Sequence, residues 1–209
     1  MTVPTITNSI SCSSLRLGLL LSLVFVCFGL SPAVRAVVPA PDGGYPDGNT
    51  AEGDFGLQSL TIGIFNTALG NGALFSNSDG FQNTATGAGA LLSNTLGSRN
   101  TANGFVALFS NILANDNTTV GWEALASNTG AQNTATGSQA LFSNTIGTFN
   151  MTSDYQALFH NTKGDSNTAN GDGALFCNTE GFDNTAVGFR RSWVTPPALA
   201  ARLMVFERS

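Results

Sequence analysis

Polar and apolar positions return along most of this chain with a fixed period of 17 residues. Each unit reads approximately Asn-Thr-Ala-x-Gly-x-x-Ala-Leu-Phe-Ser-Asn-Thr-x-Gly-x-x, and we number these columns from one to seventeen. A fixed period of this kind predicts a solenoid in which every unit forms one coil. The units begin at Asn49, Asn66, Asn83, Asn100, Asn117, Asn133, Asn150, Asn167 and Asn184.

The repeat region 49–189 is expected to fold as an all-β, parallel β-solenoid of eight to nine coils. Each coil has room for two short strands, the first over Asn-Thr-Ala-x and the second over Ala-Leu-Phe-Ser. Column five is glycine in every unit except one, which has Asp154. Glycine and aspartate both enter the left-handed backbone region readily, so a turn with positive φ is expected at this column.

Stacked coils align identical side chains into ladders, which are the expected source of stability. A buried leucine contributes about 1.5–3 kcal/mol, and stacked asparagine amides can form ladders like those of cross-β stacks. The preference of asparagine and threonine for turns also explains the Asn-Thr columns. Turn preference and amide ladders can act together. The expected ladder residues are Asn66, Asn83, Asn100, Asn117 and Asn133; Gly70, Gly87, Gly104, Gly121 and Gly137; and Leu74, Leu91, Leu108, Leu125 and Leu141.

Columns nine and ten, leucine followed by phenylalanine, predict an apolar ladder on the outside of the solenoid. Adjacent residues of a strand point to opposite faces, so only one of these columns can point inside. If Ala-Leu-Phe-Ser forms a helical turn instead, both columns can face inward. Exposed apolar ladders usually mark interfaces, and the expected interface residues are Phe75, Phe109, Phe142, Phe159 and Phe176.

Two departures from the pattern predict local structure. The Asn117 unit lacks one residue between Thr129 and Gly130, which predicts a corner that can shorten without disturbing strand register. The first unit has Leu60 where later units have asparagine, as expected of a terminal capping coil.

The segments outside the repeats have a different composition. Residues 1–36 resemble a secretory signal, with an apolar core from Leu17 to Leu30 and small residues suited to cleavage after Ala36. Residues 37–48 are rich in proline and glycine and predict an extended linker. The tail 190–209 carries no trace of the repeat. Two interpretations of the tail stay open. Ala198–Glu207 forms a short helix that caps the solenoid, or the reading frame was lost in the last unit and the tail is not a selected sequence.

Charge argues against two classes of partner. The net charge is −5, and only Arg99 and Lys163 are positive between Asn49 and Phe189. No basic stripe can therefore neutralise phosphates or an anionic membrane surface, so neither nucleic acid nor such a membrane is an expected partner. The apolar run of the leader is too short to span a bilayer, and no membrane span is expected in the mature chain.

Residues that could carry catalysis or bind a metal are scattered. His160, the one histidine, and Cys177, the one cysteine of the mature chain, both replace serine in column eleven. The carboxylates fall in different columns and build no repeated calcium site. We therefore expect no enzyme, no metal and no cofactor.

The sequences Asn83-Thr84-Ala85-Thr86-Gly87, 133–137 and 184–188 resemble the YadA-type head repeats of trimeric autotransporter adhesins. The resemblance covers about two thirds of the chain and implies a left-handed parallel β-roll that trimerises and binds extracellular matrix or other surfaces. The 17-residue period is longer than the usual coil of that family. The tail resembles neither its stalk nor its membrane anchor.

Together these observations predict a secreted or cell-surface, non-enzymatic structural or adhesive module. The expected target is extracellular matrix, a glycan or another cell surface. A β-solenoid glycan-processing enzyme and an ice-binding β-helix stay open as alternatives. The former needs neighbouring carboxylates. The latter needs a flat threonine array, but paired Thr-x-Thr occurs only at Thr84/Thr86 and Thr134/Thr136.

Overall fold

The computed structural model describes residues 46–189 and 204–205. By its contacts the chain divides into Met1–Ala36 and Val37–Ser209, and every described residue belongs to the second unit. The expected signal segment, linker residues 37–45 and all of the tail except Met204 and Val205 lie outside the described residues. Among the residues described, no helix has the length and apolar character needed to cross a membrane.

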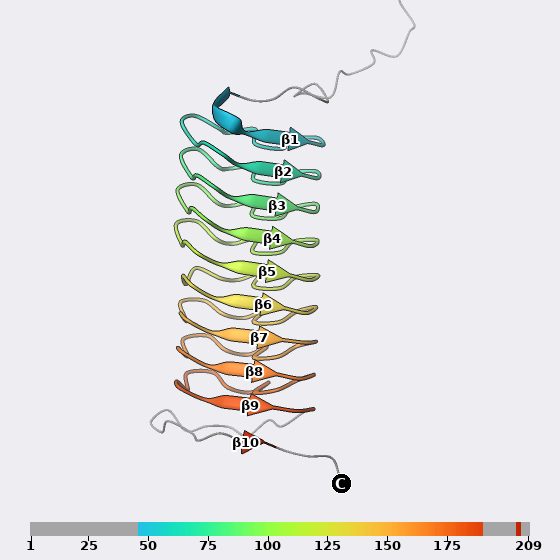
Figure 1. Cartoon of the computed structure of the whole chain (residues 1–209), viewed down its shortest axis with the longest axis vertical. Coiled ribbons are helices and arrows are strands. Elements are labelled where there is room, and N and C mark those ends of the chain that lie inside the picture. The colour runs from blue at the N-terminus through green and yellow to red at the C-terminus, as the bar shows by residue number, and fades with distance from the viewer. Residues whose placement is uncertain (1–45, 190–203, 206–209) are drawn as a thin grey trace, which may run out of the picture. The chain divides into compact units, whose positions relative to one another are not determined.

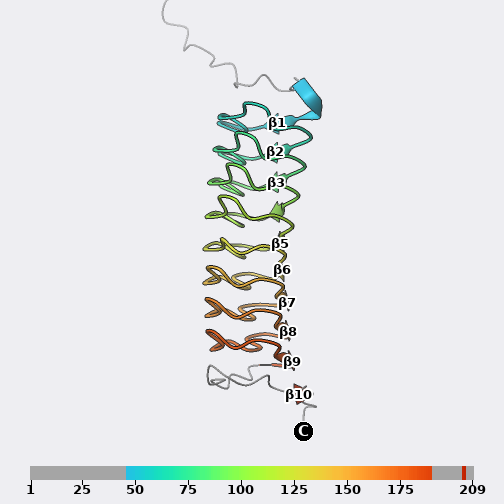
Figure 2. The same cartoon turned by 90° about the vertical axis from the view of Figure 1, so that its left-hand side faces the viewer.

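The repeats form a parallel β-solenoid, which confirms the predicted fold class. Each unit from Asn49 to Asn184 contributes one three-residue strand, and each strand pairs in parallel with the next in one sheet. Figure 1 shows the strands stacked in chain order, and Figure 2 shows them along one side of the coils. The strands are β1 (Thr50–Glu52), β2 (Thr67–Leu69), β3 (Thr84–Thr86), β4 (Thr101–Asn103), β5 (Thr118–Val120), β6 (Thr134–Thr136), β7 (Met151–Ser153), β8 (Thr168–Asn170) and β9 (Thr185–Val187).

The middle residue of each strand points into the coil, and its two neighbours point outward. In β3, Ala85 is fully buried, while Thr84 is exposed and Thr86 is partly exposed. This alternation follows from the two-residue period of a strand. Column three therefore belongs to the core, and columns two and four face solvent.

The expected second strand is absent, and this prediction was wrong. Residues 71–76 of the second coil form consecutive turns, and the same holds for the equivalent residues of the other coils. The reason lies in the backbone hydrogen bonds. The N–H groups of Leu74 and Ser76 donate to carbonyls of the next coil, whereas those of Ala73, Phe75 and Asn77 close turns within their own coil.

The column-nine leucines adopt a backbone conformation that side chains usually avoid. Their φ angles lie between 49° and 53°, and a residue with a Cβ atom pays about 1–2 kcal/mol for this region. Seven of these side chains, from Leu57 to Leu158, are at least 98% buried, which stabilises by about 1.5–3 kcal/mol each. Burial therefore offsets the backbone strain.

The glycines of column five bring the backbones of neighbouring coils close together. Gly104 has a φ of +146°, and a Cβ atom placed on it would lie 2.2 Å from the carbonyl oxygen of Gly121. Asp154, the exception, has a φ of +87°. The positive φ expected at this column is confirmed, and close approach of the next coil is a second reason for glycine.

The corner between Thr129 and Gly130 shortens without shifting the sheet. Thr118 of β5 still pairs with Thr134 of β6, although the unit between them is one residue short. The prediction for this corner is confirmed.

Both ends of the stack differ from the expectation. Pro46–Gly48 forms a 3-10 turn (η1), where an extended linker was expected, and the carbonyl of Asp47 accepts a hydrogen bond from the Phe65 N–H. Met204–Val205 forms β10, which pairs in parallel with β9. A helix over Ala198–Glu207 was one of two alternatives for the tail, and at these two positions the chain is a strand instead, because the backbone of β9 offers an edge for one more strand.

Gly104→Ala is expected to lower the free energy of unfolding by at least about 2 kcal/mol, because its methyl group would collide with the backbone of the next coil. Urea unfolding monitored by circular dichroism measures this loss. Gly72→Ala is the control. Gly72 also has positive φ, but the nearest atom to an added Cβ is the Leu92 Cδ1, 3.5 Å away. Equal losses in the two variants would contradict the close-approach argument.

Candidate functional site

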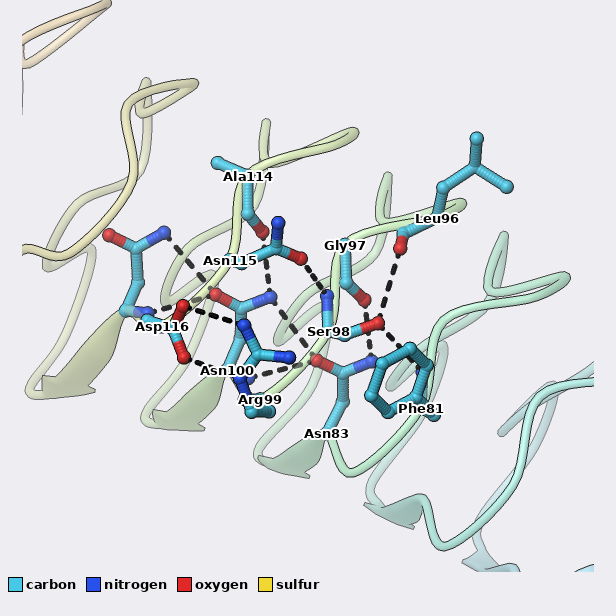
Figure 3. Close-up of polar contacts among 11 residues, drawn as sticks. Phe81, Asn83, Leu96, Gly97, Ser98, Arg99, Asn100, Ala114, Asn115 and Asp116 are labelled. Carbon is cyan, nitrogen blue, oxygen red and sulfur yellow. Dashed lines mark hydrogen bonds and ion pairs between the residues drawn. The ribbon is translucent and has the colours of Figure 1, made fainter.

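The column-one asparagines form a continuous amide ladder inside the solenoid. The backbone N–H of Asn100 and its Nδ2 both donate to the Oδ1 of Asn83, at 3.0 and 3.2 Å. The same Nδ2 donates to the carbonyl of Ala114 at 2.9 Å, as Figure 3 shows. The predicted ladder residues Asn66, Asn83, Asn100, Asn117 and Asn133 are all fully buried.

A second asparagine ladder runs through column twelve, whereas the asparagine ladder residues expected from the sequence all lie in column one. The Nδ2 of Asn94 donates to the Oδ1 of Asn77 at 2.7 Å and to the carbonyl of Gly97 at 2.8 Å. The recurrence of Asn-Thr-x-Gly in register was the sequence feature that could have predicted this ladder. The column-twelve asparagines are Asn77, Asn94, Asn111, Asn128, Asn144, Asn161 and Asn178, and all are fully buried.

The threonines of column thirteen add a third set of contacts between coils. The hydroxyl of Thr145 donates to the carbonyl of Thr162 at 2.8 Å, and that of Thr162 donates to the carbonyl of Thr179 at 3.0 Å. Threonine at this column therefore has a role beyond turn preference.

The column-twelve ladder breaks at the shortened corner. The Nδ2 of Asn128 donates to the carbonyl of Gly130 at 2.6 Å instead of reaching back to Asn111. Among the described side chains, the Oδ1 of Asn111 and the Oγ1 of Thr119 are the buried polar atoms that lack a partner. The missing residue thus leaves the sheet in register but weakens the polar interior beside it.

The predicted column-nine ladder is the apolar core. Leu74, Leu91, Leu108, Leu125 and Leu141 are fully buried and pack with the alanines of columns three and eight. The predicted glycine ladder, Gly70, Gly87, Gly104, Gly121 and Gly137, lies at the turn after each strand, with φ between 125° and 146°.

Column ten lies on the outside, as predicted from the strand argument, although the segment is a turn. Phe142, Phe159 and Phe176 stack face to face, with ring centroids 5.2 Å apart and planes within 9°. Leu92 and Ala126 interrupt the aromatic column in other coils. The expected interface residues Phe75, Phe109, Phe142, Phe159 and Phe176 are all partly exposed. Within one chain, stacking therefore covers part of the rings of Phe142, Phe159 and Phe176.

Sequence reasoning missed two more exposed apolar groups. In column six, directly after the turn residue, Phe105, Trp122, Tyr155 and Phe189 are 52%, 48%, 43% and 58% exposed. In column fourteen, at the opposite corner of the unit, Ile62, Leu96, Leu113 and Ile146 are 73%, 51%, 59% and 59% exposed. Only some units carry these side chains, so neither column stands out in the consensus.

The threonines of column two line the outer face of the sheet. They lie in register from β1 to β6, with pairs such as Thr84↔Thr101, and Met151 replaces threonine in β7. The paired Thr-x-Thr arrangement remains confined to β3 and β6.

His160 and Cys177 lie in column eleven, beside the stacked phenylalanines. The His160 imidazole is exposed and packs edge-on against Phe159 and Phe176, with ring centroids 4.8 and 4.9 Å away. In the described part of the chain, no group of three or more His, Cys, Asp or Glu side chains is placed to hold a metal ion.

Both cations of the repeats pair with carboxylates on the surface. Arg99 Nε and Nη2 donate to the two carboxylate oxygens of Asp116 at 2.6 and 2.8 Å (Figure 3). The hydrogen bond from Arg99 lowers the pKa of Asp116. Lys163 Nζ lies 3.1 Å from Glu180 Oε1. Exposed pairs of this kind add little stability, and they leave the repeats with little free positive charge.

No family model, no curated protein and no solved structure matches this chain.

Thr119→Ala is expected to raise the free energy of unfolding by about 1 kcal/mol. The substitution removes a buried hydroxyl without a partner, which costs about 1–3 kcal/mol, and the lost methyl group offsets about 0.8 kcal/mol of that gain. Thermal unfolding followed by circular dichroism measures the change. The control is Thr152→Ala in the same column, because the Thr152 hydroxyl donates to the carbonyl of Thr134 at 3.5 Å. A Thr119→Ala variant no more stable than the parent would show that this hydroxyl is satisfied.

Proposed function

We propose that this chain is a secreted or cell-surface, non-enzymatic binding module that acts as an oligomer, with a trimer as the favoured state. The observation that carries the proposal is the column of partly exposed aromatic rings, Phe142, Phe159 and Phe176, repeated coil after coil along one side of the solenoid. Apolar ladders on a surface favour association.

The chemistry of the repeats supports a binding role over a catalytic one. A β-solenoid glycan-processing enzyme would use two carboxylates on either side of the scissile bond. The carboxylates of the repeats are instead spread over different columns, and two of them, Asp116 and Glu180, pair with cations. Most buried polar side chains of the described residues are asparagine amides of the two ladders, which stabilise coils rather than transfer protons.

The resemblance to trimeric adhesin heads supports the trimer and the extracellular setting. It rests on the Asn-Thr-Ala-x-Gly motif, whose asparagine and glycine have structural roles between coils. In a trimer of this kind, column ten of each copy packs toward the other copies.

The mature chain, beginning at Val37, is expected to be a trimer, and Phe142→Asp with Phe159→Asp is expected to convert it to a monomer. A buried charge without a partner opposes association strongly. Light scattering after size-exclusion chromatography gives the mass of each species. Phe149→Asp with Phe182→Asp is the matched control, because both residues are exposed and lie in columns seventeen and sixteen. A monomeric parent chain would refute the oligomer.

Expression of the full chain in a secreting host is expected to release a product that starts at Val37. Small residues flank the expected cleavage point after Ala36. Mass spectrometry of the secreted protein identifies its first residue. Retention of the full chain, with Met1 intact inside the cell, would contradict the extracellular assignment.

A further inference from the structure

We propose that the column-six aromatic strip, defined as Trp122, Tyr155 and Phe189 with Phe105 beside them, binds an extended, neutral, β-1,4-linked polysaccharide. This inference rests on the proposed function, since it names the ligand of the extracellular binding module. The strip is separate from column ten, so one chain can use column ten for association and column six for a ligand.

The exposure of these rings is the first observation. Trp122, Tyr155 and Phe189 are 48%, 43% and 58% exposed. In contrast, the column-ten rings of Phe142, Phe159 and Phe176 cover one another by stacking. An exposed aromatic ring can serve as a platform for the C–H face of a sugar ring, while the hydroxyl edges of the sugar remain available for hydrogen bonds.

The spacing of the rings is the second observation. Trp122, Tyr155 and Phe189 belong to the units that begin at Asn117, Asn150 and Asn184, so they recur at every second coil. Two strand spacings amount to about 9.5 Å. In an extended β-1,4-linked chain every second sugar presents the same face, at a repeat of similar length. The residues between the rings are Ser138 and Asp172, which are smaller.

Backbone hydrogen bonds fix the main chain beneath the rings. The carbonyl of Trp122 accepts the N–H of Gln139 at 2.8 Å, and that of Tyr155 accepts the N–H of Gly173 at 2.9 Å. Each of these two column-six residues is thus tied to the next coil. A preorganised site loses little conformational entropy on binding, which favours a repeating ligand.

The polar surroundings favour a neutral ligand. Column four, two residues before the strip, carries Asn103, Ser153 and Asn170 in these coils, and the charged residues next to or within the strip, Glu123, Asp154 and Asp172, are all acidic. Within the described residues Arg99 and Lys163 are both paired with carboxylates. Anionic polysaccharides and nucleic acids would meet net negative charge without compensation.

The test measures sedimentation of the mature chain with insoluble cellulose and chitin. It also measures binding of soluble cello- and chito-oligosaccharides by the fluorescence of Trp122, in a Trp193→Phe background. The parent is expected to bind at least one of these β-1,4-linked chains. Trp122→Ala and Tyr155→Ala are each expected to weaken binding at least tenfold, while Trp122→Phe, which keeps an aromatic ring, retains most of it in the sedimentation assay.

The controls separate this proposal from its competitors. Phe149→Ala and Phe182→Ala remove exposed rings outside the strip and are expected to leave binding unchanged. Equal binding of dextran, an α-linked glucan, or of anionic alginate would overturn the geometric and charge arguments. Absence of binding to both β-1,4-linked chains would also overturn the proposal.

Light scattering on the same variants distinguishes a failed ligand from a failed oligomer. Trp122→Ala is expected to keep the mass of the parent, and its circular dichroism spectrum confirms the fold. If Trp122→Ala dissociates the oligomer, the strip is a contact between copies and the ligand proposal is wrong. If the oligomer persists and no polysaccharide binds, only the ligand proposal fails.

Discussion

The buried amide of the column-one asparagine is the contact on which the rest of the solenoid depends. Each Oδ1 accepts hydrogen bonds from the following coil, and in most coils the Nδ2 donates to a backbone carbonyl fourteen residues further along the chain, as Asn83 does to Gly97. A buried amide without partners costs about 1–3 kcal/mol. Each amide is therefore satisfied only when the next coil stacks at the right height, and this requirement favours a constant period.

The requirement for close stacking explains the other invariant columns. Coils linked by amide ladders leave no space between backbones at the turn, which is why Gly104 and Gly121 carry no side chain. The short strands follow as well, because only three residues per coil are extended before the turn begins. Where the Asn117 unit is one residue short, the sheet absorbs the change, and Asn111 loses an amide partner instead.

Much of this interior was predictable because it repeats. The solenoid, the first strand, the positive φ of column five and the leucine core all follow from column identity. The second strand was predicted wrongly, since leucine and phenylalanine suggest extended backbone and nothing in the residue Leu74 indicates a left-handed φ of 51°. The burial of the Leu74 side chain favours that conformation. The column-six rings could not be predicted from the repeat, because column six differs from unit to unit. Trp122 and Tyr155 each occur in one unit and are absent from the consensus.

The division between inner and outer columns bears on the binding role proposed for this chain. Most inner columns repeat one residue from coil to coil, with exceptions such as Thr119 and Thr152 in column three, so chemical variety lies mainly in side chains that face solvent. These positions repeat at the height of one coil, and a ligand that contacts several of them must itself be extended and periodic. A small molecule would meet one coil at a time. Of the outer columns that carry rings, column ten has stacked rings such as Phe142 and Phe159, while Trp122 and Tyr155 of column six lie two coils apart and are 48% and 43% exposed. An interior built by repetition thus favours recognition of another repeating chain.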